Sequence, residues 1–206
     1  MRPLPRLHAV TDAEVLAAPD FGVRAAAIAA AGPAVGLHAR DRAAGGAALA
    51  RAAERMVALA RPPEAAVFVN ARPDVAAAVG AQGVQLGGND LTPADARRVL
   101  GHGWIGRSVH SEGEARAAVD EGADFLLVGS VYETPSHPGR PAAGLGLVRA
   151  AAALGRPVIA IGGIDAARAV EVREAGAYGV AAIRALWGTA DPAAAALALL
   201  SPWVDS

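Results

Sequence analysis

The sequence predicts an α/β fold, a single (β/α)8 TIM barrel that spans residues 1–206 as one domain. Short apolar runs alternate with longer stretches rich in Ala, Leu, Arg and Glu, which is typical of repeated strand–helix units around a buried parallel sheet. Eight such runs occur, and eight strands each followed by a helix close into a barrel. The competing doubly wound sheet usually has a glycine-rich turn after its first strand, but Val10-Thr11-Asp12-Ala13 contains no glycine.

The elements follow from the apolar runs and from the residues that separate them. The expected strands are Leu7–Val10, Val35–Ala39, Ala66–Val69, Gly83–Leu86, Trp104–Arg107, Phe125–Val128, Val158–Ile161 and Gly179–Ile183. The expected helices are Ala13–Ala30, Ala47–Leu59, Val75–Val79, Pro93–Leu100, Glu112–Glu121, Leu145–Leu154, Ala166–Ala175 and Pro192–Leu200. Thr92, Ser111 and Asp165 are N-cap residues that mark three of the helix starts.

The composition excludes several classes of function. The 206 residues carry 19 basic and 20 acidic side chains, and a net charge of -1 argues against a nucleic-acid partner. Every basic residue is arginine, so a lysine Schiff base and a phosphate-loop lysine are both excluded. Without cysteine, there are no disulfides, thiolate nucleophiles or zinc-thiolate sites. The short apolar run after Arg6 predicts no signal peptide and no uninterrupted run predicts a membrane span, so we expect a cytoplasmic protein without a membrane partner.

Function in a TIM barrel sits at the carboxyl ends of the strands, where this chain is rich in polar residues. Gly162 and Gly163 follow the seventh predicted strand, and Ile183 and Arg184 follow the eighth. Exposed backbone N–H groups at such turns bind phosphate, so we predict a phosphorylated ligand there. The alternative is that the two glycines only form a tight turn.

Two arginines follow the second predicted strand. Arg40 and Arg42 alternate along an extended segment, so we expect one of them to face the pocket unless the backbone turns between them. Arginine suits bidentate recognition of a carboxylate or phosphate, although a solvated pair around Asp41 is an equal alternative. Asp90 offers an oxygen ligand for magnesium or an N-cap for the helix near Pro93.

Further polar residues complete the predicted site. We expect Asn70, Asp90, Ser108, Thr134 and Ser136 to contact the substrate. Five histidines could act as acids or bases, and position discriminates among them. His38, His110 and His137 lie near the carboxyl ends of strands, whereas His8 lies inside a strand and His102 in a turn at the opposite face. The loop from Glu133 to Gly144 could close over the ligand.

Several motifs resemble the thiamine phosphate synthase superfamily over nearly the whole chain. They are Ala9-Val10-Thr11-Asp12, Gln85-Leu86-Gly87-Gly88-Asn89-Asp90-Leu91, Ile105-Gly106-Arg107-Ser108-Val109-His110, Ala123-Asp124-Phe125 and Ile159-Ala160-Ile161-Gly162-Gly163-Ile164. The resemblance implies a (β/α)8 barrel with a thiazole phosphate as small-molecule ligand. The superfamily has two main branches, thiamine phosphate synthase itself and the TenI-like thiazole tautomerases.

Departures from the synthase pattern favour the tautomerase branch. His38-Ala39-Arg40-Asp41-Arg42 replaces Gln-x-Arg-x-Lys, and Ala71 replaces one of two magnesium-binding aspartates, leaving Asp90. Thr134-Pro135-Ser136-His137 replaces Thr-x-Thr-Lys, whose lysine binds diphosphate. We therefore predict a thiazole tautomerase of thiamine biosynthesis, an isomerase that uses no metal or cofactor and is a homo-oligomer.

In this reading, a histidine moves a proton on the thiazole carboxylate phosphate. His137 is the first catalytic candidate and His38 the second, because Ser130 stands where a tautomerase pattern has its catalytic histidine. Ser130 itself is the third candidate. Gly163, Ile183 and Arg184 would bind the phosphate, with Arg40 or Arg42 on the carboxylate. Two alternatives are a thiamine phosphate synthase, which would use Mg²⁺ to join a pyrimidine diphosphate to thiazole phosphate, and a regulator that only binds thiazole or thiamine phosphates.

Overall fold

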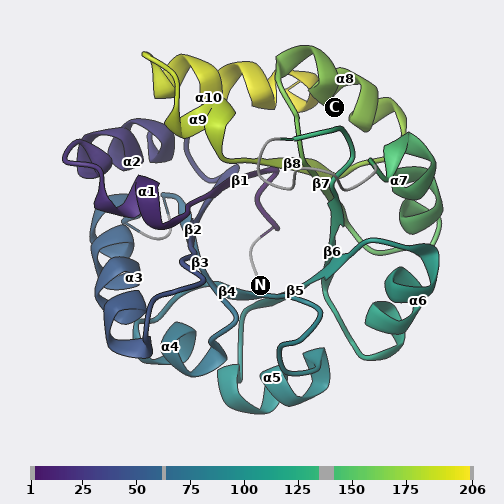
Figure 1. Ribbon diagram of the computed structural model, residues 1–206, viewed down its shortest axis with the longest axis horizontal. Coiled ribbons are helices and arrows are strands. Elements are labelled where there is room, and N and C mark those ends of the chain that lie inside the picture. The colour runs from purple at the N-terminus through teal and green to yellow at the C-terminus, as the bar shows by residue number, and fades with distance from the viewer. Residues whose placement is uncertain (1–2, 62–63, 135–141, 205–206) are drawn as a thin grey trace.

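The computed structural model describes residues 3–61, 64–134 and 142–204, and it confirms the (β/α)8 barrel. Eight parallel strands pair in sequence order, and β8 pairs with β1 to close the sheet, inside a ring of helices (Figure 1). The strands are β1 Leu7–Val10, β2 Val35–Ala39, β3 Ala66–Asn70, β4 Gly83–Leu86, β5 Trp104–Val109, β6 Phe125–Gly129, β7 Val158–Ile161 and β8 Gly179–Ala182.

The helices agree with the sequence except in the first and the last units. They are α1 Ala13–Ala17, α2 Phe21–Ala29, α3 Gly46–Ala60, α4 Pro73–Ala78, α5 Pro93–Leu100, α6 Glu112–Asp120, α7 Gly144–Ala152, α8 Ala166–Glu174, α9 Arg184–Trp187 and α10 Pro192–Leu200, followed by a 3-10 turn Ser201–Trp203. The single helix expected from Ala13 to Ala30 is wrong. Ala18 is extended because it precedes Pro19, which disfavours helical backbone in the residue before it.

Side-chain caps fix where several helices begin. The side chains of Thr92, Ser111 and Asp165 each accept a hydrogen bond from a backbone N–H in the first turn of α5, α6 and α8, as the sequence predicted. Asp12 does the same for α1 directly after β1. These caps determine where the strand–helix loops end, and those loops carry the pocket described below.

Apolar side chains form two separate layers, one inside the barrel and one between the strands and the helices. The inner layer consists of Leu4, Val10, Phe68, Phe125, Leu127, Ile159 and Ala181. Gly106 makes room for the Phe125 ring, because a Cβ at position 106 would lie 2.2 Å from Cζ of that ring. The aromatic rings fill the middle of the barrel, so any cavity along its axis must lie at one of its ends.

Polar side chains are also buried inside the barrel. His8, Thr11, His38 and Gln85 are at most 1% exposed.

No helix in the described ranges is both long enough and apolar enough to cross a lipid bilayer.

Candidate active site

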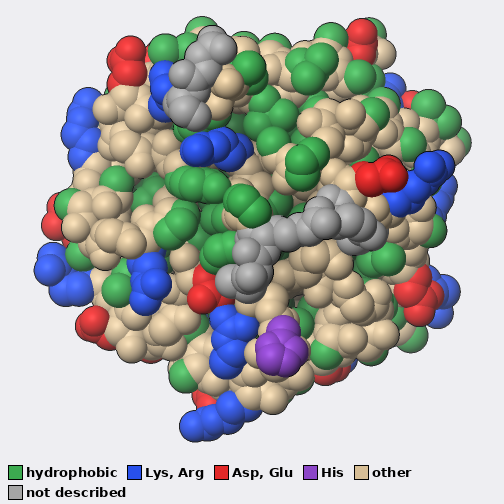
Figure 2. All heavy atoms as spheres, turned by 180° about the vertical axis from the view of Figure 1, so that it is seen from behind, with side chains coloured by type: hydrophobic (Ala, Val, Ile, Leu, Met, Phe, Trp, Pro, Cys, Tyr) green, Lys and Arg blue, Asp and Glu red, His purple; other side chains and the backbone are tan. Residues whose placement is uncertain are grey.

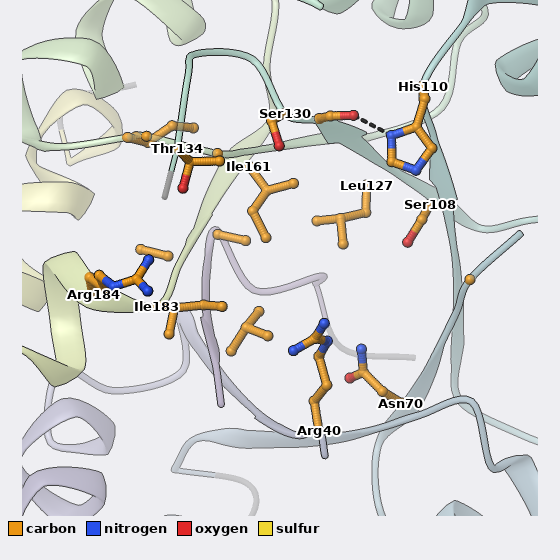
Figure 3. A pocket seen from close by; sticks show the side chains of 18 of the residues that line it. Arg40, Asn70, Ser108, His110, Leu127, Ser130, Thr134, Ile161, Ile183 and Arg184 are labelled. Carbon is orange, nitrogen blue, oxygen red and sulfur yellow. Dashed lines mark hydrogen bonds between the residues drawn. The ribbon is translucent and has the colours of Figure 1, made fainter. Parts of the chain in front are cut away.

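A cavity of about 400 Å³ opens at the carboxyl ends of the strands (Figure 3). Its walls come from every strand or the loop that follows it. The lining residues are Val10, Arg40, Arg42, Asn70, Gly87, Gly88, Ser108, His110, Leu127, Gly129, Ser130, Thr134, Ile161, Gly162, Gly163, Ile164, Ala181, Ala182, Ile183, Arg184 and Ala185. The charged side chains in this set are the three arginines, and none of the described lining residues is a carboxylate. The cavity is therefore suited to an anionic ligand.

One part of the wall is the predicted phosphate site after β7 and β8. Gly162 and Gly163 have φ angles of 105° and 65°, the left-handed region that favours glycine. A Cβ on Gly163 would lie 2.7 Å from the carbonyl oxygen of Glu133, so the backbone comes closer here than another residue type would allow. Ile183 and Arg184 lie on the same side of the cavity (Figure 3). The four residues meet at one wall, and we call them the β7–β8 wall.

A second part of the wall follows β2. Both Arg40 and Arg42 line the cavity, which is the exception that the expectation allowed for: the extended strand ends at Ala39 and the backbone bends at Arg42. The backbone N–H of Arg40 donates to Oγ1 of Thr11 at 3.0 Å, which ties this loop to the end of β1. Burial lowers the pKa of Arg40, and the charge of Arg42 lowers it further. Two cations held together in this way favour an anion between them.

Hydroxyl and imidazole groups lie on the remaining walls. Ser108 accepts a hydrogen bond from Nε2 of Gln85 at 3.1 Å. Ring nitrogen Nδ1 of His110 contacts the carbonyl oxygen of Gly129 (Figure 3). Ser130 and Thr134 line the cavity as expected. These groups can donate hydrogen bonds or accept them from a polar ligand.

Two expected site residues do not line the cavity. His38 is fully buried below it, with one ring nitrogen 2.7 Å from His8 and the other 3.1 Å from Asn70. Burial lowers the pKa of His38 to about 4, so its ring is neutral near pH 7. Asp90 accepts a hydrogen bond from the backbone N–H of Gly87 at 2.6 Å, so its carboxylate stabilises that turn.

Two further predicted residues, Ser136 and His137, lie outside the described residues. The lid expected between Glu133 and Gly144 falls largely in the same gap, and its closure stays a prediction.

The described residues do not fit a magnesium ion held by protein carboxylates. They contain no group of three or more His, Asp or Glu residues that could hold a metal. Ala71 follows Asn70 where the synthase pattern has an aspartate, and the carboxylate of Asp90 is bonded to Gly87. We therefore assign no step to a metal.

The site prediction did not include the apolar part of the wall. Leu127 and Ile161 face the cavity from β6 and β7, together with backbone at Gly87 and Gly88. These two residues could have been predicted from the alternation along each strand, because every second residue of a barrel strand points inward. His110 was one of three histidine candidates but not one of the final site residues, and it does line the cavity.

Comparison with known proteins identifies relatives of one kind. The family model described as thiamine monophosphate synthase matches residues 7–186. Thiamine-phosphate synthase from Thermus thermophilus is 53% identical over 148 residues, 71% of each chain. That of Mycolicibacterium vanbaalenii is 48% identical over 139 residues, 66% of this chain and 63% of the other. A solved structure of thiamine phosphate pyrophosphorylase from Pyrococcus furiosus has a TM-score of 0.80 at 33% identity, covering 96% of this chain and 94% of that one.

These relatives overturn the prediction of a thiazole tautomerase. They are named as synthases, and the family match does not distinguish the TenI-like branch. The prediction was wrong because it relied on three local departures from the synthase pattern, although the family match covers residues 7–186. One of them, Arg42 where the synthase pattern has lysine, keeps the positive charge at the cavity. The protein is an enzyme of thiamine biosynthesis, and its chain belongs to the thiamine monophosphate synthase family.

Proposed function

We propose that the protein is a thiamine-phosphate synthase, a transferase that joins a pyrimidine diphosphate to a thiazole phosphate. The observation that carries this proposal is that two separate walls of one cavity are suited to anions. Arg40 and Arg42 form one of them, and the β7–β8 wall forms the other (Figure 3). Two phosphorylated substrates need both. A tautomerase acting on a thiazole carboxylate phosphate would also use both walls, one for each anionic group, and the synthase names of the relatives favour the synthase.

The reaction breaks the carbon–oxygen bond between the pyrimidine methylene group and the diphosphate. The electron pair of that bond leaves with the diphosphate, and the thiazole nitrogen then shares its lone pair with the resulting carbocation. Negative charge therefore grows on the departing diphosphate. Arg40 and Arg42 line the cavity and would bind it through charge-assisted hydrogen bonds, which stabilise the transition state.

The β7–β8 wall would hold the other substrate. Backbone N–H groups near Gly163 and the guanidinium of Arg184 suit the phosphate of the thiazole. Leu127 and Ile161 line the same cavity and provide an apolar surface for the rings (Figure 3). Apolar walls also limit water, which would otherwise capture the carbocation in place of the thiazole nitrogen.

The test is a turnover assay. Purified protein is supplied with the pyrimidine diphosphate and thiazole phosphate, with and without magnesium, and both thiamine phosphate and released diphosphate are measured. We expect the two products in equal amounts. Binding of both substrates without any product would contradict the proposal and favour a protein that only binds these phosphates.

A further inference from the structure

A line of hydrogen-bonding groups runs through the barrel interior up to the cavity. Nε2 of His8 lies 3.0 Å from the carbonyl oxygen of Pro5, and Nδ1 of His8 lies 2.7 Å from Nε2 of His38. Nδ1 of His38 lies 3.1 Å from the amide oxygen Oδ1 of Asn70. Both rings are fully buried, and Asn70 lines the cavity. The line therefore connects the amino end of the barrel to a residue that faces the ligand.

The number of ring protons does not match this arrangement. Three contacts join four groups, and the groups at the two ends, Pro5 and Asn70, are both oxygen acceptors. Three N–H donors are needed, but each neutral imidazole carries one N–H, and the pair carries two. Either one of the rings bears an extra proton, or the amide of Asn70 is turned by 180° so that its NH₂ group faces His38.

Burial argues against the extra proton. Desolvation is the largest influence and lowers the pKa of both histidines. The hydrogen bonds to Asn70 and to the Pro5 carbonyl raise these pKa values, and the charges of Arg40 and of the neighbouring ring lower them, so the net pKa of each ring stays below its ordinary value. No described carboxylate is hydrogen-bonded to either ring. An imidazolium here would be a buried, uncompensated charge.

A turned amide satisfies every contact. His8 then donates from Nε2 to Pro5, His38 donates from Nε2 to His8, and Nδ2 of Asn70 donates to Nδ1 of His38. The carbonyl oxygen of Asn70 takes the other position, toward the cavity. Strand register places Ala39 beside Val69, so Arg40 and Asn70 follow side by side (Figure 3), and a cation favours the oxygen end of the amide dipole.

We propose that His8 and His38 are positioning residues that hold the Asn70 amide with its carbonyl oxygen toward the ligand, so that Asn70 accepts a hydrogen bond from a ligand N–H group. The charged side chains around the cavity are arginines, which only donate hydrogen bonds. Hydroxyl groups on the other walls can also accept hydrogen bonds, but a fixed amide oxygen at Asn70 favours a heteroaromatic ring that carries an amino group there over one that carries only acceptors. The inference rests on the proposed function at one point only, which is the identification of this ring as the ring of the pyrimidine substrate.

The first measurement is the tautomer of each ring. Two-bond ¹H–¹⁵N correlation spectra of the labelled protein at pH 7 should show His8 and His38 as neutral rings protonated at Nε2. In His8→Phe, His38 loses its acceptor, and its proton should move to Nδ1, where Oδ1 of Asn70 can accept it. An imidazolium, or a parent His38 protonated at Nδ1, would overturn the proposal.

The second measurement is ligand preference. The dissociation constants of 4-aminopyrimidine and 4-methoxypyrimidine are compared by ligand-observed NMR. The parent should favour the amino compound by about tenfold, the effect of one hydrogen bond to an otherwise unpaired group. The preference should fall to about one in Asn70→Ala and in His8→Phe.

Phe68→Leu is the matched control. The Phe68 ring stacks on His38 with centroids 4.8 Å apart but forms none of the three hydrogen bonds, so this variant should keep the preference. An unchanged preference in His8→Phe, or no preference in the parent, would overturn the proposal. Failure of the turnover assay with these two results intact would remove the proposed function and leave the assignment of the amide standing.

Discussion

Arginine has opposite roles at the two ends of the barrel. At the carboxyl ends of the strands, Arg40 and Arg42 face an open cavity. At the amino ends, the guanidinium of Arg6 lies 4.3 Å from the centre of the Tyr178 ring and donates to the Tyr178 carbonyl oxygen at 2.8 Å. None of the described residues that line the cavity offers these two cations a carboxylate, and the guanidinium of Arg40 donates only a long hydrogen bond of 3.4 Å to the carbonyl oxygen of Thr11. Arg6 is held more closely by its contacts with Tyr178.

The surroundings of these arginines differ in the same way. The hollow at the amino end is lined mainly by apolar side chains, among them Leu4, Trp104, Leu200 and Trp203, and Figure 2 shows hydrophobic side chains gathered over the middle of this face. The residues that follow most of the strands line the cavity, whereas Arg6 and Tyr178, which precede β1 and β8, contact each other. We therefore expect substitutions at the carboxyl end to change function and those at the amino end to change stability.

The largest expected effect is that of Gly163→Val on ligand binding. Its Cβ would meet the Glu133 carbonyl oxygen at 2.7 Å and displace the backbone of the β7–β8 wall. We expect the affinity for thiazole phosphate, measured by calorimetry, to fall by about 100-fold as the phosphate contacts are lost.

Gly155→Val is the matched control for this variant. Gly155 has a similar φ of 74°, but nothing lies within 4 Å of a Cβ there. It should lose stability to the same backbone strain and keep its affinity. Equal affinities in the two variants would contradict the role given to the β7–β8 wall.

Arg40→Gln should reduce turnover by about 10²-fold, in line with the loss of a group that stabilises developing charge. The change is expected in kcat more than in the midpoint of thermal unfolding, because Arg40 faces the cavity. Arg6→Gln at the amino end should instead lower the midpoint of thermal unfolding more than it lowers kcat. If both variants keep the parental kcat, diphosphate release does not depend on the cations after β2.

Trp203→Ala should lower the free energy of unfolding by about 3 kcal/mol, as expected for removing a large buried apolar side chain. Trp203 is only 7% exposed and packs at the amino end. Urea titration measures the loss, and the KM values for both substrates should stay at the parental level. A large rise in either KM would show that the two ends are not independent.

A further expected effect concerns the pH dependence of stability. His38 has a pKa of about 4 in the folded protein, below its ordinary value of 6.5, so the unfolded chain binds a proton between these values while the folded protein does not. Stability contributed by the neutral ring is therefore present above pH 6.5 and is lost as the pH falls toward 4, by about 3 kcal/mol.

His38→Gln removes this titration and tests the sign. Urea titrations at pH 7 and pH 4.5 should show a smaller difference in unfolding free energy for His38→Gln than for the parent. The exposed His102 is the control, and His102→Gln should behave like the parent. An equal pH dependence in His38→Gln and the parent would contradict a buried neutral His38.

The sequence predicted the barrel because its strands are short, apolar and separated by recognisable helix caps such as Thr92 and Asp165. It predicted the β7–β8 wall because glycines after the seventh strand of a barrel expose backbone N–H groups that bind phosphate. The alternation of side chains along a strand could not predict that Arg42 faces the cavity, since this depends on a bend after β2. The burial of His38 was missed for a related reason: an inward-facing residue lies either in the core or in the cavity, depending on its height along the barrel axis.

The central claim is that the cavity binds two phosphorylated groups at once, and calorimetry with inorganic diphosphate and thiazole phosphate tests it directly. Diphosphate should bind the protein already saturated with thiazole phosphate, in a ratio of one to one. Arg40→Gln should weaken diphosphate alone, and Gly163→Val should weaken thiazole phosphate alone. Competition between the two ligands for a single site, with both variants weakening both ligands equally, would contradict the account.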